Sequence, residues 1–184
     1  MQTINAGIFG NTGTIIAGTF ANAGISDNKR IGNYDGERAN LIVSCTDTVI
    51  SRVFISDRFN KDYNANYRPP YEIPLYWIDF GNTQHSGQVI IGSKTISQPN
   101  SKKYNVVDKL KTVTELFDYS TLKDNDTIPS CSLVEALKKQ DLFINSSLAT
   151  FGCDILWRMF REGFIDYQGC FLNLKTGKMN RVRI

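Results

Sequence analysis

A short apolar run that ends abruptly in small polar residues constrains the fold of this chain more than any other feature. Leu41, Ile42 and Val43 are followed by three small residues, 44–46, and then by the carboxylate of Asp47. Three consecutive apolar residues predict a strand that is covered on both faces, as in a parallel sheet flanked by helices. Asp47 would then lie just past the carboxyl end of the strand, where open α/β sheets bind their ligands.

The carboxylate of Asp47 has two alternative roles. It can hold Mg²⁺ on a nucleotide, because Mg²⁺ is usually bound by one or two carboxylates together with phosphate oxygens. It can instead cap the helix that we expect from about residue 47 to residue 59. Taken alone, the pattern favours capping, whereas the rest of the chain favours the metal.

Apolar runs bounded by turn signals predict a three-layer α/β domain with a mixed sheet. The expected strands are residues 14–20, 41–44, 75–80 and 88–92, followed by a C-terminal hairpin of residues 169–174 and 179–184. Residues 41–44 and 75–79 should be adjacent or near-adjacent parallel strands, because a helical segment joins them. Residues 88–92 should return as an antiparallel partner of the strand before them.

A long helix from about residue 141 to residue 162 should pack in the core, because its apolar residues recur every three or four positions. These residues are Ile144, Leu148, Phe151, Ile155 and Met159. In the helix at 47–59, Val49, Val53 and Phe54 form the apolar face that should turn inwards. Ile4, Ile8 and Phe9 suggest the end of a helix, with Gly10 placed to stop it. A short helix should open at residues 130–132, and residues 93–130 should be rich in loops.

Charge and cysteine content argue against several classes of protein. The 184 residues suit one domain, and a net charge of +3 is too small to indicate a nucleic-acid partner. No apolar run approaches the ~20 residues of a membrane span, and no signal peptide is visible. Four widely spaced cysteines without a CxxC pair, and a single histidine, argue against zinc and indicate reduced thiols in a cytoplasm. Cys45, Cys153 and Cys170 are expected in the core.

Four segments, in this order, resemble the ThiF/MoeB family of adenylyltransferases, which activate ubiquitin-like proteins. They are "LIVSCTDT" (41–48), "LYWIDFGNTQHSGQVIIG" (75–92), "TVTELF…DNDTIPSCSLVEALKKQDLFINSSLATFGCDILWRMFREG" (112–163) and "IDYQGCFLNLKTGK" (165–178). Together they cover most of residues 40–184. Both zinc-binding CxxC pairs of the biosynthetic members are missing, which favours the ThiF-related member of the PRTRC cassette of mobile elements.

The resemblance implies a Rossmann-like domain with a mixed, mainly parallel sheet and with ATP and Mg²⁺ at its carboxyl edge. The C-terminal carboxylate of a small ubiquitin-like partner would attack the α-phosphate of ATP and give an acyl-adenylate and pyrophosphate. Some members then pass the acyl group to a cysteine or a sulfur carrier, and a homodimer is compatible with the family. Asp47 matches the metal-holding aspartate of the family, with Thr48 in place of the usual Asn.

Cys131 lies in "PSCS", where ThiF-type enzymes carry a cysteine just before a helix. Backbone N–H groups and the helix dipole would stabilise a thiolate there, which makes Cys131 the candidate catalytic cysteine. The alternative is a small buried residue in a loop. If the tail of the partner enters beneath the loop at 124–131, Asp47 and Cys131 should lie on the same edge of the sheet.

The phosphate-binding elements of the family are not recognisable in this sequence. Its GxGGxGS loop would lie upstream of residue 1, so we expect residues 1–184 to be a single partial ThiF-type domain without the N-terminal Gly-rich βαβ unit. Residues 7–13 are rich in glycine but have the wrong spacing for GxGxxG. Asp79, Phe80 and Gly81 spell the kinase DFG, but no HRD loop accompanies them.

Two functions therefore remain open. The first is ATP-dependent, adenylyltransferase-type activation of a ubiquitin-like C-terminus, incomplete as this chain. The second is a non-catalytic interaction module that binds the ubiquitin-like partner without using ATP.

Overall fold

The computed structural model describes the backbone of residues 2–5 and 18–20, and residues 39–46, 48–61, 73–117, 119 and 143–184 in full. The strand expected from residue 14 is therefore described only from residue 18. The helix expected at residues 130–132 and the loop at 124–131 lie outside this part of the chain, as do residues 7–13.

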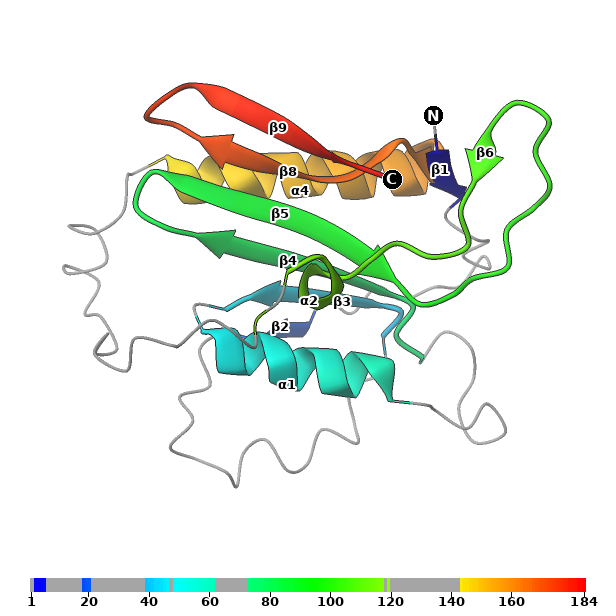
Figure 1. Ribbon diagram of the computed structural model, residues 1–184, viewed down its shortest axis with the longest axis horizontal. Helices are drawn as coiled ribbons and strands as arrows, with labels where there is room; N and C mark the ends of the chain where they lie inside the picture. The colour runs from blue at the N-terminus through cyan, green and yellow to red at the C-terminus, as the bar shows by residue number, and fades with distance from the viewer. Residues whose placement is uncertain are drawn as a thin grey trace.

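Six strands form the larger sheet, in the order β2-β3-β4-β5-β8-β9 (Figure 1). The strands are β2 (Gly18–Phe20), β3 (Leu41–Cys45), β4 (Tyr76–Asn82), β5 (Ser86–Ser93), β8 (Tyr167–Asn173) and β9 (Lys178–Arg183). β2, β3 and β4 pair in parallel, which confirms the expected adjacency of residues 41–44 and 75–79. β5 pairs antiparallel with β4, as predicted.

The sheet is mixed, but parallel pairing is confined to its first three strands. β5 with β8 and β8 with β9 are both antiparallel pairs. The expectation of a mainly parallel sheet thus holds only from β2 to β4. The reason is the short connection from β4 to β5, since a parallel strand would need a crossover of a dozen or more residues.

Helices pack against both faces of the sheet because β4 points its side chains alternately to the two sides. Tyr76 and Ile78 share one apolar cluster with Ile155 and Met159 of α4 (Ile144–Arg161). Trp77, between them, belongs to a second cluster on the other face. That face is covered by α1 (Val49–Asn60) and by the single turn of α2 (Val113–Leu116).

The core-facing stripe predicted for the long helix is confirmed. Ile144, Leu148, Ile155 and Met159 are at most 3% exposed, and Phe151 is half-buried against the same cluster. The inward face predicted for α1 is wrong. Val53 and Phe54 are 43% and 38% exposed, and Val49 is half-exposed. The buried positions of α1 are Arg52, Ile55, Ser56 and Phe59, so two of the four inward side chains are polar.

One further expectation is corrected by pairing between distant segments. Ile4 does not end a helix but lies in β1 (Gln2–Asn5), which pairs with β6 (Asn105–Val106) and β7 (Phe164–Ile165). Residues 94–117, in the segment expected to be rich in loops, are mostly loop and contain only the short elements β6 and α2. The carboxylate of Glu115 accepts a hydrogen bond from the Thr112 N–H at 2.8 Å, half of a capping box that begins α2.

Replacing Gly152 in α4 by Ala should destabilise the protein, although Gly→Ala inside a helix ordinarily stabilises by roughly 0.5–1 kcal/mol. A Cβ at this position would lie 2.3 Å from Cζ of Phe80. We expect the free energy of unfolding in urea to fall by about 1–3 kcal/mol. Ser146→Ala, at an exposed position of the same helix, is the control and should not destabilise. Equal or greater stability of Gly152→Ala would contradict the packing of α4 on β4.

Candidate functional site

A buried polar cluster occupies the carboxyl ends of the parallel strands β3 and β4. The Arg52 Nε–H donates to Oδ2 of Asp79 at 2.9 Å, and both side chains are almost fully buried. Ser44, the fourth residue of β3, donates its hydroxyl to Oδ1 of Asp79 at 2.6 Å. Trp77 Nε1 in turn donates to the Ser44 oxygen at 2.7 Å. Both oxygens of the Asp79 carboxylate are therefore occupied within the protein.

Burial and ion pairing shift the pKa of the Asp79 carboxyl in opposite directions. Burial raises the pKa of the Asp79 carboxyl above its ordinary value, and the Arg52 guanidinium and the Ser44 hydroxyl oppose this shift only in part. A buried ion pair is weak evidence for net stability, but removing one partner leaves an uncompensated charge in the interior. The buried charge of Asp79 therefore needs Arg52 as its partner. Because Arg52 must face the sheet to reach Asp79, this pairing fixes which side of α1 is turned inwards.

Arg52 also holds the turn between β3 and α1. Its Nη2 donates to the carbonyl oxygens of Thr46, at 2.5 Å, and of Phe80, at 3.2 Å. Gly81 makes room for this contact, since a Cβ there would lie 2.7 Å from Nη2. One guanidinium therefore connects the ends of two adjacent parallel strands at the edge where α/β sheets bind ligands.

An open cleft of about 510 Å³ adjoins this cluster. Thr46 and Arg52 line it, together with the end of β4, the start of β5, the end of β8 and, around the start of β9, Thr176, Lys178 and Asn180. Its described lining contains the cations Arg52 and Lys178 and no Asp or Glu. A cleft of this composition suits an anionic group rather than a cation.

Thr46 carries an unusual feature of the cleft wall. Thr46 is only 6% exposed, and no hydrogen-bond partner for its Oγ1 is found in the described part of the chain. An unsatisfied buried hydroxyl costs about 1–3 kcal/mol, so such groups call for an explanation. Because Thr46 borders the cleft, a rotation of its side chain would present the hydroxyl to a ligand oxygen there.

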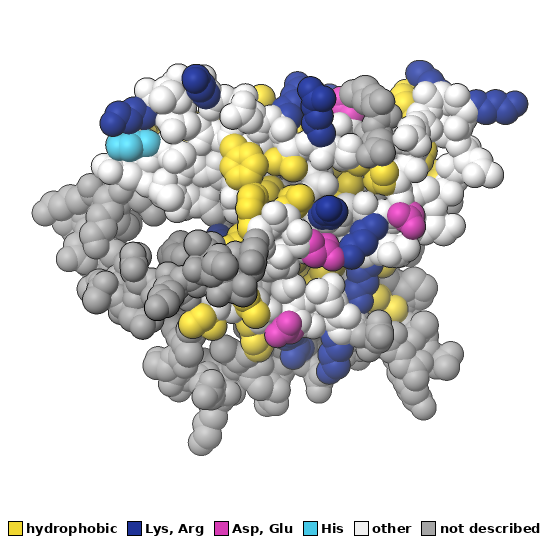
Figure 2. Space-filling model, in the orientation of Figure 1, with side chains coloured by type: hydrophobic (Ala, Val, Ile, Leu, Met, Phe, Trp, Pro, Cys, Tyr) yellow, Lys and Arg dark blue, Asp and Glu magenta, His cyan; other side chains and the backbone are white. Residues whose placement is uncertain are grey.

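Aromatic side chains form one margin of the cleft. The rings of Phe117 and Phe171 meet edge to face with centroids 5.8 Å apart, and Phe117 meets Tyr119 in the same way at 6.3 Å. Tyr119 is hydrogen-bonded to Gln88, a residue of the lining, and burial raises the pKa of its phenol. Figure 2 shows hydrophobic side chains gathered near the middle of the viewed face, over α2 and the neighbouring strands.

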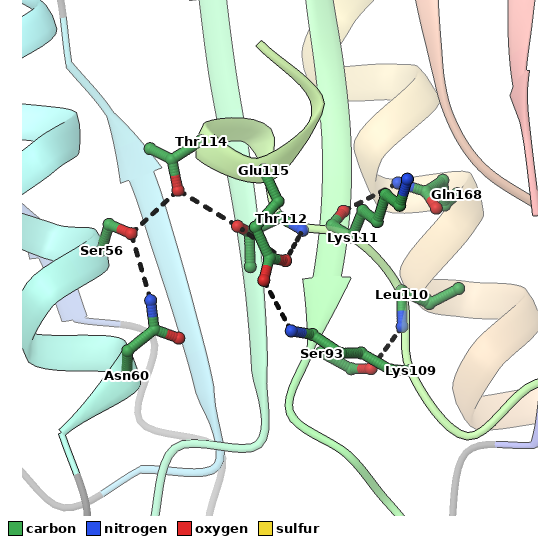
Figure 3. Close-up of polar contacts among 10 residues, drawn as sticks. All are labelled: Ser56, Asn60, Ser93, Lys109, Leu110, Lys111, Thr112, Thr114, Glu115 and Gln168. Carbon is green, nitrogen blue, oxygen red and sulfur yellow. Dashed lines mark hydrogen bonds and ion pairs between the residues drawn. The ribbon is translucent and has the colours of Figure 1, made fainter. Parts of the chain in front are cut away.

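A polar network anchors α2, which precedes this aromatic margin (Figure 3). The hydroxyls of Ser56 on α1 and Thr114 on α2 are 2.8 Å apart. Thr112 and Thr114 hydroxyls are 3.1 Å apart, which extends the contact to the helix start. A Cβ at Gly92 of β5 would lie 2.5 Å from Cα of Thr112, so this backbone rests directly on the sheet. α2 is thereby fixed to α1 and β5.

Neither of the site residues predicted from the sequence can be placed, because Asp47 and Cys131 lie outside the described residues. The proposed shared edge is therefore not tested. Thr48, not Asp47, is the N-cap of α1, and its hydroxyl accepts from the Ser51 N–H at 3.2 Å. Asp47 thus does not hold the N-cap position.

The cysteine expectations are corrected for two residues and confirmed for one. Cys45 and Cys153 are exposed rather than core residues. Cys45 ends β3 and follows the buried Ser44, so the alternation of the strand turns it outwards. Cys170 is buried, and burial raises the pKa of its thiol.

The described lining of the cleft contains no carboxylate that could bind Mg²⁺. Asp79 is engaged by Arg52 and Ser44, and no group of three or more metal-ligating side chains is found among the described residues. The sequence motif at 79–81 is consistent with this structural role, since the aspartate faces the core. Sequence reasoning overlooked Arg52, because a charged residue in a helix that also contains Asp57 and Arg58 is ordinarily taken as a surface residue.

Replacing Arg52 by Ala should lower the free energy of unfolding by about 3–5 kcal/mol, because Asp79 keeps a buried charge without its partner. The matched control is Arg158→Ala. Arg158 also donates to an aspartate, Asp154, at 2.9 Å, but this pair is about 40% exposed, so the loss should stay below about 1 kcal/mol. Equal losses for the two variants, measured by chemical unfolding, would contradict the role assigned to the buried pair.

The same variant should show a distinct pH dependence. Because the folded-state pKa of Asp79 is raised above 3.8, the stability linked to its proton is fully present below that value and is lost as the pH rises through the folded-state pKa. Removing Arg52 should raise this pKa further. The destabilisation by Arg52→Ala should therefore be largest near about pH 7 and shrink towards about pH 4. A destabilisation that grows on acidification would exclude this origin.

Comparisons with known proteins add no assignment. No protein-family model matches the sequence, and neither does any curated protein. Within the described residues, no helix has the length and apolar character needed to cross a membrane.

Proposed function

We propose that this chain binds the C-terminal tail of a small ubiquitin-like protein in the cleft at the ends of β3 and β4. The observation that carries the proposal is the lining of the cleft, whose described part contains the cations Arg52 and Lys178 and no Asp or Glu. A terminal carboxylate is an anion that suits such a lining. Asp47, which the resemblance assigns to the metal, directly follows Thr46 in the sequence.

The proposed reaction is ATP-dependent activation of that tail, as in the ThiF-type domain that the four segments resemble. An oxygen of the tail carboxylate bonds to the α-phosphorus of ATP, the bond from this phosphorus to the bridging oxygen breaks, and pyrophosphate leaves. When bound, Mg²⁺ would neutralise phosphate charge, but the described residues supply no carboxylate for it. In the proposal, Asp47 holds the metal and Cys131 is the candidate thiol for a later acyl transfer.

The residues of the described site have separate tasks in this proposal. The Arg52–Asp79 pair fixes the turn that leads to Asp47, through the hydrogen bond from Arg52 to the Thr46 carbonyl. Lys178 holds the anionic end of the tail, and Thr46, four strands away in the same sheet, borders the other end of the cleft. Phe171, at the aromatic margin, covers the extended tail and reduces its contact with water. A Rossmann-like three-layer domain with β8 and β9 as its C-terminal hairpin is part of the same proposal.

Tail binding is tested with a peptide of about ten residues that ends in Gly-Gly. We expect the free carboxylate to bind about tenfold or more tightly than the same peptide with a C-terminal amide, because the amide removes the charge. Lys178→Met should remove most of this difference, as measured by calorimetric titration, because it removes the cation that meets the carboxylate. Lys102→Met, at an exposed position outside the cleft, is the control. Equal binding of acid and amide would overturn the assignment of the cleft.

Adenylation is tested with the chain, ATP, Mg²⁺ and a ubiquitin-like partner, with and without a segment that carries the GxGGxGS loop of the family. We expect little or no acyl-adenylate from this chain alone, because that phosphate-binding loop is not recognisable in its sequence. Supplying the segment should give an acyl-adenylate on the partner, detected by mass spectrometry, and Asp47→Ala should then abolish it while leaving tail binding in place. The described cleft lacks a free carboxylate, an observation that favours the alternative of a non-catalytic module. Tail binding without any acyl-adenylate even when the segment is supplied would support this alternative and contradict the proposed reaction.

A further inference from the structure

β9 is the outermost strand of the larger sheet, next to β8 and with no strand on its other side among the described residues (Figure 1). Its six residues extend about 20 Å at the usual rise of ~3.3 Å per residue. The N–H and C=O groups on the outer side of such a strand are unpaired and form a template for one more strand.

The edge carries positive charge. Lys178, Arg181 and Arg183 of β9, and Lys175 in the preceding turn, are all exposed. No salt bridge joins any of them to a carboxylate in the described part of the chain, and Arg181 lies over the ring of Tyr167 with its guanidinium carbon 4.8 Å from the centroid. Figure 2 shows Lys and Arg side chains spaced along the upper margin of the molecule, where β9 lies in Figure 1.

We propose that the outer edge of β9 binds an extended acidic segment of a protein partner as an added strand. Backbone hydrogen bonds would give the affinity, and the four cations would select acidic side chains. Like charges along an edge also oppose pairing with a second copy of the same strand, so the edge discriminates against self-association. This inference is independent of the nucleotide chemistry proposed above.

The arrangement of the cations favours a peptide strand over a nucleic acid. Lys178 and Asn180 point to the face that contains the cleft, whereas Arg181 points to the opposite face, over Tyr167. A peptide strand added at this edge would therefore have cations on both of its faces. A phosphate backbone is instead met by cations clustered on one face, and the net charge of the chain is only +3.

The test uses the native chain and a labelled peptide of about twelve residues in which Glu alternates with Thr and Val. The matched control peptide carries N-methyl groups on alternate backbone amides, which preserves its charge but prevents strand pairing. We expect the N-methylated peptide to bind about tenfold or more weakly, measured by fluorescence anisotropy, because it cannot form the backbone hydrogen bonds to the outer edge of β9. Equal binding of the two peptides would overturn strand addition, as would tighter binding of a single-stranded oligonucleotide of equal charge.

Charge reversal on the strand gives the second readout. Arg181→Glu with Arg183→Glu should weaken the acidic peptide about tenfold or more and reduce the salt dependence of its binding. Neither residue lines the cleft, so binding of the Gly-Gly tail should persist, which separates this inference from the proposed function. Lys102→Glu with Arg161→Glu is the charge-matched control at exposed positions elsewhere. Because Arg181 contacts Tyr167, Arg183→Glu alone is the variant that leaves this contact intact. Undiminished peptide binding by Arg183→Glu and by the double variant would overturn the proposal.

Discussion

The ion pair between Arg52 and Asp79 is the interaction on which the carboxyl edge of the sheet depends. Asp79 is buried in β4, and burial disfavours its charge, so the guanidinium must reach it from α1. That requirement sets which side of α1 faces the sheet and leaves Val53 and Phe54 exposed. The same guanidinium holds the carbonyl of Thr46, so the core and the cleft wall are coupled through one side chain.

Strands and the long helix could be predicted because their signals are local. Consecutive apolar residues identified β3 and β4, and the spacing from Ile144 to Met159 identified the inward face of α4. The inward face of α1 could not be found in this way, because periodicity counts Arg52 and Ser56 as surface residues. Their burial depends on Asp79 and Thr114, which lie 27 and 58 positions away in the sequence. β1 likewise needs partners more than 100 residues away.

The sequence predicted where the candidate site lies, but not which residues line it. The rule that ligands bind beyond the carboxyl ends of parallel strands directed attention to residues 44–48, where the cleft begins. The position of Thr46 depends on its contact with Arg52, and the contribution of Lys178 depends on the pairing of β9 with β8, neither of which a local pattern specifies. Lys178 belongs to both the cleft and the basic edge of β9. A partner bound along this edge would therefore lie beside the cleft that we assign to its tail.

Hydrogen exchange at the backbone amides of Thr46 and Thr48 tests most directly whether the buried pair fixes the binding edge. If Arg52 and Asp79 hold this turn, both amides should exchange slowly in the native chain and rapidly in Arg52→Ala under conditions where β5 remains protected. Adding the Gly-Gly peptide should slow exchange further at these positions. Fast exchange in the native chain, or equal exchange in the native chain and the variant, would contradict a cleft wall organised by the ion pair.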